Sequence, residues 1–404
     1  MAITRALTGN QAAAHAARLC KVQMVGFFPI GPSDEVAEEI ARFIQKGQMK
    51  ATIMDLQNER SVMNAMVMGS ESGVRTMFAT NSEGLYFAAE PIKAAAVHRV
   101  PVIVPVANRA LEPPLIVTPD YQDTVGLRDS FWLQVYCENP QDVLDTTIQI
   151  FRIAEDPTIR LPAFVCFDGW EVSHSSFTVS LPDQADVDAF VPPYEREPED
   201  DILRLDYREM YHGQRTLAEL GTDDYMEQRH HLLSAHARAL DAIEAVNREY
   251  AALTGRNWGG VIDTEGIDDA DVVIVTMGAM TSTARLAVAA LRRAGRRVGL
   301  VKMRAFRPFP ADRLRELLAR VPVVVVIERD ISGAIYQELR SALYGSIPCP
   351  RVLGRVAGIG GRDVTPEDII HLAEEGFTAA AGGAAEEHRW HFGLRGARVV
   401  RGGR

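Results

Sequence analysis

The stretch Val22-Gln-Met-Val-Gly-Phe-Phe28-Pro29-Ile30-Gly31-Pro32-Ser33-Asp34-Glu35 decides the fold class. Its apolar run, 22–28, is typical of a buried strand, and the prolines and glycine that follow predict a tight turn. Ser33 is a preferred N-cap residue, and acidic side chains at 34 and 35 suit the first turn of a helix. The stretch therefore predicts a strand, a turn and a helix in succession.

The same alternation repeats along the chain. Further strands are predicted at 51–55, 74–79, 100–106 and 163–167, and then at 271–277, 298–302 and 321–327. Helices are predicted between them, including 283–294 and 311–318. Such alternation indicates an α/β fold, in which parallel sheets are covered by helices on both faces.

Two domains are expected, because 404 residues exceed the size at which one hydrophobic core usually stops growing. The run 180–206 is rich in Pro, Asp and Glu, which predicts an exposed linker, and a long helix is predicted at about 223–253. We therefore predict a first domain at 1–255 that includes this linker and helix, a second domain at 256–376 and a tail at 377–404, which we expect to be frayed.

The composition is that of an ordinary globular protein, with 47% hydrophobic and 24% charged residues. A net charge of -11 argues against a nucleic-acid partner. The N-terminus lacks the pattern of a secretory signal, and no run approaches the roughly 20 apolar residues that cross a bilayer, so we expect a cytoplasmic protein without membrane contact. Cys20, Cys137, Cys166 and Cys349 form no Cys-x-x-Cys pair, so we predict reduced core thiols and no metal or iron-sulfur site.

Three polar features each follow a predicted strand of the first domain, at the edge where open α/β sheets bind ligands. The turn 28–33 would aim backbone N–H groups at an anion, and the guanidinium of Arg109 is well shaped for a carboxylate. Glu59 lies between the strand 51–55 and a predicted small-residue helix, 61–70. Taken singly, each feature also has a structural explanation: a proline-flanked turn, a helix-terminal acid and a surface charge.

Taken in order, these stretches resemble the alpha subunit of pyruvate:ferredoxin-type 2-oxoacid oxidoreductases. The resemblance rests on Gly9-Asn10-Gln11-Ala12-Ala13, Phe28-Pro29-Ile30-Gly31-Pro32-Ser33, Asn58-Glu59-Arg60-Ser61, Ala107-Asn108-Arg109-Ala110 and Gly126-Leu127-Arg128-Asp129-Ser130. The segments 302–310, 328–332 and 360–366 are similar to the transketolase C-terminal-like domain of that family, and the resemblance covers about 8–373. It implies a thiamine-diphosphate-binding fold, with a pyrimidine-type domain followed by a transketolase C-terminal-like α/β domain.

The resemblance also implies the chemistry. Thiamine diphosphate would bind between this chain and a beta subunit, with Glu59 hydrogen-bonded to the aminopyrimidine and Arg109 on the carboxylate of the substrate. The implied site residues are catalytic Glu59 and Arg109, cofactor-binding Glu59, Pro29 and Ile30, and substrate-binding Phe28, Gly31, Asn108 and Arg109. The implied reaction is oxidative decarboxylation of a 2-oxoacid with coenzyme A, which gives acyl-CoA and carbon dioxide.

Several parts of that machinery are missing from the sequence. No Gly-Asp-Gly with a distant Asn is present to hold magnesium and the diphosphate, and Asp168-Gly169 is the nearest fragment. The resemblance therefore implies Mg²⁺ on the beta subunit, and iron-sulfur clusters and FAD on gamma and delta subunits. These partners would pass electrons to ferredoxin or NAD. We expect the chain to be inactive alone.

Two departures from the family pattern bear on the substrate. The family turn usually reads Tyr-Pro-Ile-Thr-Pro, but Phe28 and Gly31 replace the Tyr and the Thr here. The frequent His-Ser-Asp of the family reads Tyr121-Gln122-Asp123. Losing two hydroxyls and side-chain volume at the turn favours an aryl 2-oxoacid such as phenylglyoxylate over pyruvate, as in a phenylglyoxylate dehydrogenase.

Two other functions remain open from the sequence. One is an E1-like or transketolase-like thiamine enzyme subunit without an iron-sulfur relay, which the identity of the partners would distinguish. The other is a non-catalytic α/β scaffold subunit, which has no need for Glu59 beside Arg109.

Overall fold

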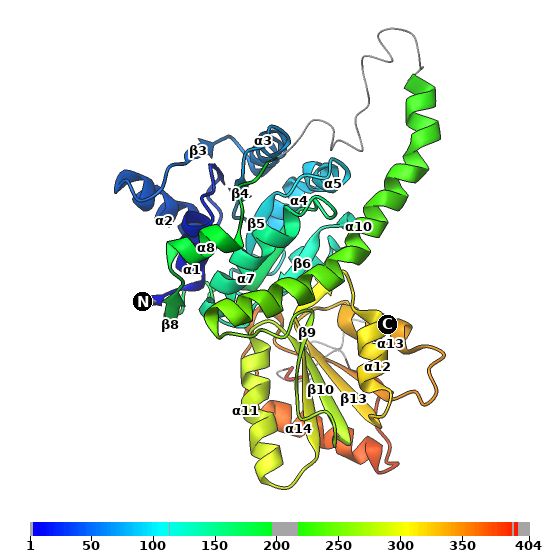
Figure 1. Ribbon diagram of the computed structural model, residues 1–404. Helices are drawn as coiled ribbons and strands as arrows, with labels where there is room; N and C mark the ends of the chain where they lie inside the picture. Colours follow the sequence, from blue (N-terminus) through cyan, green and yellow to red (C-terminus); the bar gives the residue numbers. More distant parts are fainter. Residues whose placement is uncertain (1–2, 113, 196–216, 390–391, 395–404) are drawn as a thin grey trace. The chain divides into compact units, whose positions relative to one another are not determined.

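The computed structural model describes residues 3–112, 114–195, 217–389 and 392–394 (Figure 1). The chain divides into two compact units, Met1–Asp263 with Met303–Pro310, and Thr264–Lys302 with Ala311–Arg404. The sequence predicted 256–263 and 303–310 as parts of the second domain, but the contacts of both segments assign them to the first unit. Among the helices that the structure describes, none has the length and apolar character needed to span a membrane.

The first unit is built on a seven-stranded sheet in the order β12-β6-β7-β5-β4-β2-β3. Its strands are β2 (Met24–Phe27), β3 (Thr52–Asp55), β4 (Thr76–Phe78), β5 (Ile103–Asn108), β6 (Leu133–Tyr136), β7 (Ala163–Asp168) and β12 (Ala305–Arg307). β12 runs antiparallel to β6, and the other pairs are parallel. The predicted parallel α/β architecture is confirmed, and β6 and β12 are additions that the sequence did not predict.

Helices cover both faces of this sheet. They are α1 (Gly9–Leu19), α2 (Asp34–Gln45), α3 (Glu59–Glu71), α4 (Ser82–Phe87), α5 (Ala89–Val97), α6 (Gln122–Val125), α7 (Pro140–Ala154), α8 (Gln184–Phe190) and α10 (Leu217–Thr254), with the 3-10 turn η1 (Arg128–Ser130). The chain reverses its direction across the sheet after β3 and after β6. Right-handed crossovers therefore put α2 and α7 on one face and α3 and α5 on the other, and α1 packs against α2 and α7.

A two-stranded ribbon accompanies the first unit. β1 (Ile3–Leu7) pairs antiparallel with β8 (Phe177–Leu181). The predicted linker 180–206 therefore begins with the end of a strand and continues into α8. Its remaining part, 196–206, lies outside the described residues.

The long helix α10 is anchored by one buried carboxylate. Asp145 on α7 is fully buried and accepts hydrogen bonds from the Tyr250 hydroxyl (2.7 Å), the Arg256 guanidinium (2.6 Å) and the Trp258 indole N–H (3.0 Å). A buried charge is tolerated only when it is paired and hydrogen-bonded, and Asp145 meets both conditions. The end of α10 and the segment after it are thus held against α7.

The second unit contains a six-stranded sheet in the order β15-β14-β13-β10-β11-β9. The strands are β9 (Ile262–Glu265), β10 (Val272–Met277), β11 (Val298–Met303), β13 (Val323–Glu328), β14 (Arg351–Val356) and β15 (His388–Arg389). The helices are α11 (Met280–Arg293), α12 (Ala311–Leu318), α13 (Ala334–Leu343) and α14 (Pro366–Ala380), with the turn η3 (Ile359–Gly361). α11 and α14 pack on each other and on β10, whereas α12 pairs with α13 (Figure 1). β10 and β13 are buried along their whole length, which explains their continuous Val and Ile runs.

The cysteines follow the prediction with one exception. Cys20, Cys137 and Cys166 are free and buried, as expected, but Cys349 is exposed. Cys349 follows the exposed Ile347 in the segment between α13 and β14, so it lies in a surface loop rather than on a packed face.

Candidate functional site

The turn 28–33 lies at a switch in strand order. The chain leaves β2 for β3 on one side and then returns to β4 on the other side of β2. In open α/β sheets, ligands bind outside the carboxyl ends of strands at such a point. The turn follows β2, and residues 80–82 follow β4, so both belong to this edge.

Two buried asparagines hold the turn. Asn10 on α1 donates its side-chain amide to the Pro32 carbonyl (2.8 Å), and Asn81 after β4 donates to the Ser33 hydroxyl (2.6 Å). Ser33 is the N-cap residue of α2, as predicted, but its side chain forms no capping hydrogen bond because it faces Asn81 instead. The turn is therefore fixed by long-range contacts as well as by its own residues.

The predicted ligand-facing residues of the turn are accessible to different extents. Phe28, Ile30 and Gly31 are half-buried and Pro29 is exposed. A Cβ built on Gly31 would meet no atom within 4 Å, and Gly31 does not adopt a left-handed conformation. A side chain at position 31 would therefore enter open space without backbone strain.

Glu59 is a buried acid at the first position of α3. The N-cap residue, Asn58, accepts a hydrogen bond from the Ser61 N–H (2.9 Å), which starts the helix and fixes the position of Glu59. Glu59 is 6% exposed, and burial raises the pKa of its carboxyl. Within the described residues, no cation forms an ion pair with it, so its charge is available to a ligand.

Helix α4 forms one wall around Glu59. A Cβ built on Gly84 would lie 2.9 Å from a carboxylate oxygen of Glu59 and 2.4 Å from the Thr80 hydroxyl. Both separations are shorter than van der Waals contact allows. The absence of a side chain at position 84 therefore leaves room for the Glu59 carboxylate.

Arg109 links the turn to the loop after β5. It is buried, and its guanidinium donates to the carbonyls of Ile116 (3.0 Å) and Gly31 (3.1 Å) and to the carboxylate of Glu112 (2.8 Å). The structure thus brings Arg109 into contact with Gly31, and the resemblance implies both residues in the substrate site. The Arg109 guanidinium pairs with two acids of this chain, Glu112 at 2.8 Å and Glu83 at 3.6 Å.

Asn108 points into the interior. Its side-chain amide donates to Asp123 (2.7 Å) and to the Thr124 hydroxyl (2.9 Å), and the residue is fully buried. The side chain therefore anchors the end of β5 to the segment that contains Asp123 and Thr124. Direct contact between Asn108 and a substrate stays a prediction.

Asp123 is a central residue that the sequence analysis did not select. It is fully buried and accepts hydrogen bonds from the backbone N–H groups of Ser82 (3.2 Å), Arg109 (3.0 Å) and Thr124 (2.8 Å). Burial raises the pKa of Asp123 to about 6, and the hydrogen bonds oppose that rise. Asp123 thereby joins the segments that follow β4 and β5. The sequence around Asp123 departs from the family pattern, and the resemblance implies no role for this residue.

Asp168 serves the interior as well. Its carboxylate accepts a hydrogen bond from the buried Tyr121 hydroxyl (2.7 Å). A Cβ on the next residue, Gly169, would lie 2.6 Å from the Asn108 carbonyl, so the glycine permits close approach of β5 and β7. In the part of the chain that the structure describes, no group of three or more His, Cys, Asp or Glu residues is arranged to hold a metal ion.

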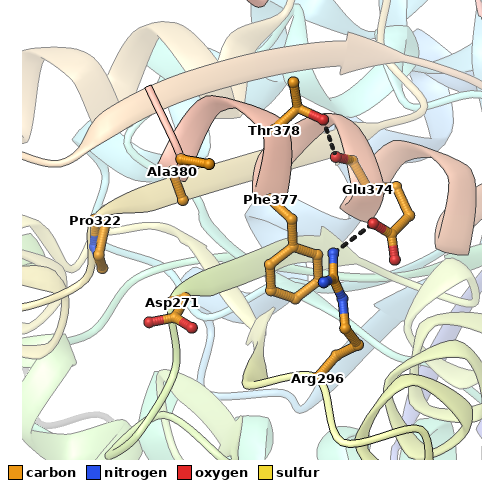
Figure 2. Close-up of a pocket in the computed structure, with 8 residues that line it drawn as sticks. Asp271, Arg296, Pro322, Glu374, Phe377, Thr378 and Ala380 are labelled. Atoms are coloured by element: carbon orange, nitrogen blue, oxygen red, sulfur yellow. Dashed lines mark hydrogen bonds and ion pairs between the residues drawn. The ribbon is translucent and has the colours of Figure 1, made fainter. Parts of the chain in front are cut away.

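A hollow in the second unit lies at the edge of the sheet where the strands begin. Figure 2 shows this hollow, which has a volume of about 440 Å³. Asp271 and Pro322 in its wall immediately precede β10 and β13, so it lies at the amino ends of these strands. Arg296 stacks on Phe377 and pairs with Glu374 there. Ligands of open α/β sheets bind at the carboxyl ends instead, so this hollow is not part of the candidate site.

Comparisons with known proteins identify relatives of this chain. Residues 15–250 match the family model described as "Pyruvate flavodoxin/ferredoxin oxidoreductase, thiamine diP-bdg", and residues 270–369 match "Pyruvate:ferredoxin oxidoreductase core domain II". The chain is 36% identical to pyruvate synthase subunit PorA of Methanothermobacter thermautotrophicus, over 92% of this chain and 96% of that one. It is 35% identical to ketoisovalerate oxidoreductase subunit VorA of Pyrococcus abyssi, over 92% and 93%.

Solved structures show the same fold. A 2-oxoglutarate:ferredoxin oxidoreductase from Magnetococcus marinus, described with 2-oxoglutarate, coenzyme A and succinyl-CoA bound, superposes with a TM-score of 0.67 at 18% identity. The match covers 93% of this chain and 65% of that one. A split-gene transketolase superposes with a TM-score of 0.51 at 14% identity, over 91% and 98%. These identities are low, so the two structures support the fold alone.

The close packing around Glu59 predicts that Gly84→Ala destabilises the protein. The added methyl group would overlap the Thr80 hydroxyl and the Glu59 carboxylate, and such overpacking costs roughly 1–3 kcal/mol. Gly31→Ala is the control, because it adds the same group where no atom lies within 4 Å, and we expect a change of less than about 0.5 kcal/mol. Thermal and urea unfolding of both variants measure the difference. Equal stability of the two variants would contradict the packing described here.

Proposed function

The chain belongs to the family of alpha-type subunits, PorA and VorA, of 2-oxoacid:ferredoxin oxidoreductases, and from this we propose that it supplies the pyrimidine side of a shared thiamine diphosphate site. The observation that carries the proposal is Glu59. It is a buried acid without a counter-cation among the described residues, at the edge of the sheet where ligands bind.

The residues on this chain fit one end of the cofactor. A buried carboxylate with a raised pKa makes a strong hydrogen bond to an aminopyrimidine ring, whose own proton exchanges during catalysis. When bound, thiamine diphosphate supplies the nucleophilic carbon that attacks the 2-oxo group and takes up the electrons left by decarboxylation. Glu59 would hold the proton that the ring gains and releases. Pro29 and Ile30, from the turn at the same edge, would flank the ring.

The diphosphate end calls for another chain. Asp168 belongs to the segment that most resembles a magnesium-binding motif. Its side chain is buried and accepts a hydrogen bond from the Tyr121 hydroxyl. We therefore propose that a beta subunit holds the diphosphate and Mg²⁺. Iron-sulfur clusters, and FAD where it is used, would be carried by gamma and delta subunits, since the cysteines of this chain lack cluster spacing.

Arg109 is proposed to bind the substrate carboxylate. Its guanidinium holds the carboxylate of Glu112, whose side chain is 38% exposed. A substrate carboxylate would replace that of Glu112 without changing the number of charge-assisted hydrogen bonds. The contact from Arg109 to the Gly31 carbonyl would remain and would keep the turn beside the substrate.

The proposed reaction is oxidative decarboxylation of a 2-oxoacid with coenzyme A to acyl-CoA and carbon dioxide, with ferredoxin or NAD as the final acceptor. Family membership favours this reaction over a transketolase-like transfer, because the matched models and relatives are oxidoreductases. A non-catalytic scaffold role is distinguished by substitution of Glu59, because a scaffold would not need this carboxylate for turnover.

We expect Glu59→Gln to leave the complex assembled and to lower turnover by ~10²–10⁴-fold, because an amide cannot accept and return the proton. Glu90→Gln is the matched control, since Glu90 is an exposed acid of α5 paired with Arg60 (3.4 Å), and it should retain activity. Steady-state turnover of the assembled enzyme and its size on gel filtration are the measurements. Near-normal turnover of Glu59→Gln would return Glu59 to a purely structural role.

The proposed substrate is an aryl 2-oxoacid, with phenylglyoxylate as the specific candidate. The support is the open space at Gly31 beside Phe28, where the family pattern has Thr and Tyr. The loss of two hydroxyls makes the turn less polar than in the family pattern. The absence of a side chain at position 31 leaves more space beside the turn. Both changes favour a large apolar substituent on the 2-oxoacid.

Gly31→Thr tests this substrate. We expect kcat/KM for phenylglyoxylate to fall about tenfold or more, because the added side chain crowds the aryl group. The kcat/KM for pyruvate should stay the same or rise, because the Thr hydroxyl offers this smaller substrate one more hydrogen bond, worth ~0.5–1.5 kcal/mol. The open surroundings of Gly31 and its ordinary backbone predict unchanged thermal stability, which is measured alongside. If both substrates change by the same factor, position 31 does not set the size of the site and the aryl proposal fails.

A further inference from the structure

A second concave surface in the first unit lies away from the candidate site. It has a volume of about 390 Å³, within the range of small-ligand sites. Its principal wall residues are Ile3, Arg5, His15, Arg18, Gln48 and Asp183. Alternation along β1 places Ile3 and Arg5 on one face of the ribbon, and helical spacing places His15 and Arg18 on one face of α1. The hollow therefore lies between the ribbon and the last turns of α1.

Two arginines in this hollow are not neutralised. In the part of the chain that the structure describes, the guanidinium groups of Arg5 and Arg18 make no ion pair and no hydrogen bond. The Arg18 guanidinium lies over the ring of Phe43, with 5.7 Å between its carbon and the ring centre. Burial, and then the nearby charge of Arg5, lower the pKa of Arg18. By contrast, Arg296 in the hollow of Figure 2 is paired with Glu374. The hollow beside α1 thus has a net attraction for anions.

A buried imidazole adds a hydrogen-bonding group to this wall. His15 is 3% exposed, and its Nδ1 has no hydrogen-bond partner. Burial, followed by the charges of Arg18 and Arg5, lowers the pKa of His15 to about 4. A buried polar atom without a partner is unfavourable, so a ligand that satisfies it gains binding energy.

We propose that this hollow binds a phosphate-bearing small molecule. Two guanidiniums present planar N–H donors that suit phosphate oxygens, and a neutral imidazole adds one more donor. The end of α1 contributes a partial negative charge of about half an elementary unit, which two full positive charges outweigh. One carboxylate, that of Asp183, also lines the hollow, so the anion would lie on the side of Arg5 and Arg18.

This site is separate from the one that contains Glu59. α1 contacts the turn 28–33 through Asn10 near its first residue and lines the hollow with its last turn. The 11 residues of α1 span about 16 Å at 1.5 Å per residue. The proposal does not depend on the thiamine chemistry proposed above.

The test is isothermal titration of the full-length chain, and of the assembled complex, with inorganic phosphate, pyrophosphate and coenzyme A at constant ionic strength. We expect saturable binding of at least one of these probes, weakened about tenfold or more in Arg5→Gln and Arg18→Gln, because each removes a charge-assisted contact. Arg315→Gln on α12 removes the same charge from an exposed ion pair with Asp312 in the second unit and should bind as the unaltered chain does. Unfolding temperatures confirm that each variant is folded.

A second readout is the NMR titration of His15, assigned with His15→Gln. A bound phosphate group should raise the pKa of His15, and chloride at the same ionic strength should not. Preference for inorganic phosphate or pyrophosphate would identify a free anion, whereas preference for coenzyme A would identify a nucleotide phosphate. Three results would overturn the proposal: no binding of any probe, equal binding by Arg18→Gln and Arg315→Gln, or loss of a partner subunit in Arg5→Gln or Arg18→Gln without an effect on anions.

Discussion

One buried carboxylate supports the edge of the sheet on which the candidate site is built. Asp123 binds the backbone at Ser82, which begins α4, and at Arg109, which follows β5. It also binds the side chain of Asn108. Together with the Thr124 N–H, these donors around a fully buried acid offset much of the cost of removing its charge from water. Without this acid, two strand ends would hold unpaired N–H groups in the interior.

The positions of the candidate catalytic groups follow from that arrangement. α4, held at its first residue by Asp123, carries Gly84 against the Glu59 carboxylate. The hydrogen bond from the Arg109 N–H to Asp123 fixes the backbone at this residue, and the Arg109 side chain then reaches the Gly31 carbonyl. The acid, the arginine and the turn therefore come from three different strands but share one supporting network. This explains how groups that are distant in the sequence form one site.

The sequence predicted the parts of this structure that depend on local pattern. The strand, turn and helix at 22–45 and the buried strands β10 and β13 were predicted, because apolar runs and turn residues specify them. β12 was missed because its three residues pair with β6, far away in the chain. The roles of Asn81 and Asp123 were missed for the same reason, since their partners lie 48 and 41 residues away. Family resemblance selected Glu59, but only the fold shows its burial and its wall at α4.

If this chain holds only the pyrimidine side of a shared site, calorimetric titration with thiamine diphosphate and Mg²⁺ will show that it needs a beta subunit to bind the cofactor. The titration is made on this chain alone, on the beta subunit alone and on their mixture. We expect tight binding of the cofactor by the mixture and no tight binding by this chain alone, because a single buried acid lacks the diphosphate contacts. Tight binding of the cofactor by the isolated chain, followed by turnover of a 2-oxoacid with an artificial electron acceptor, would contradict it.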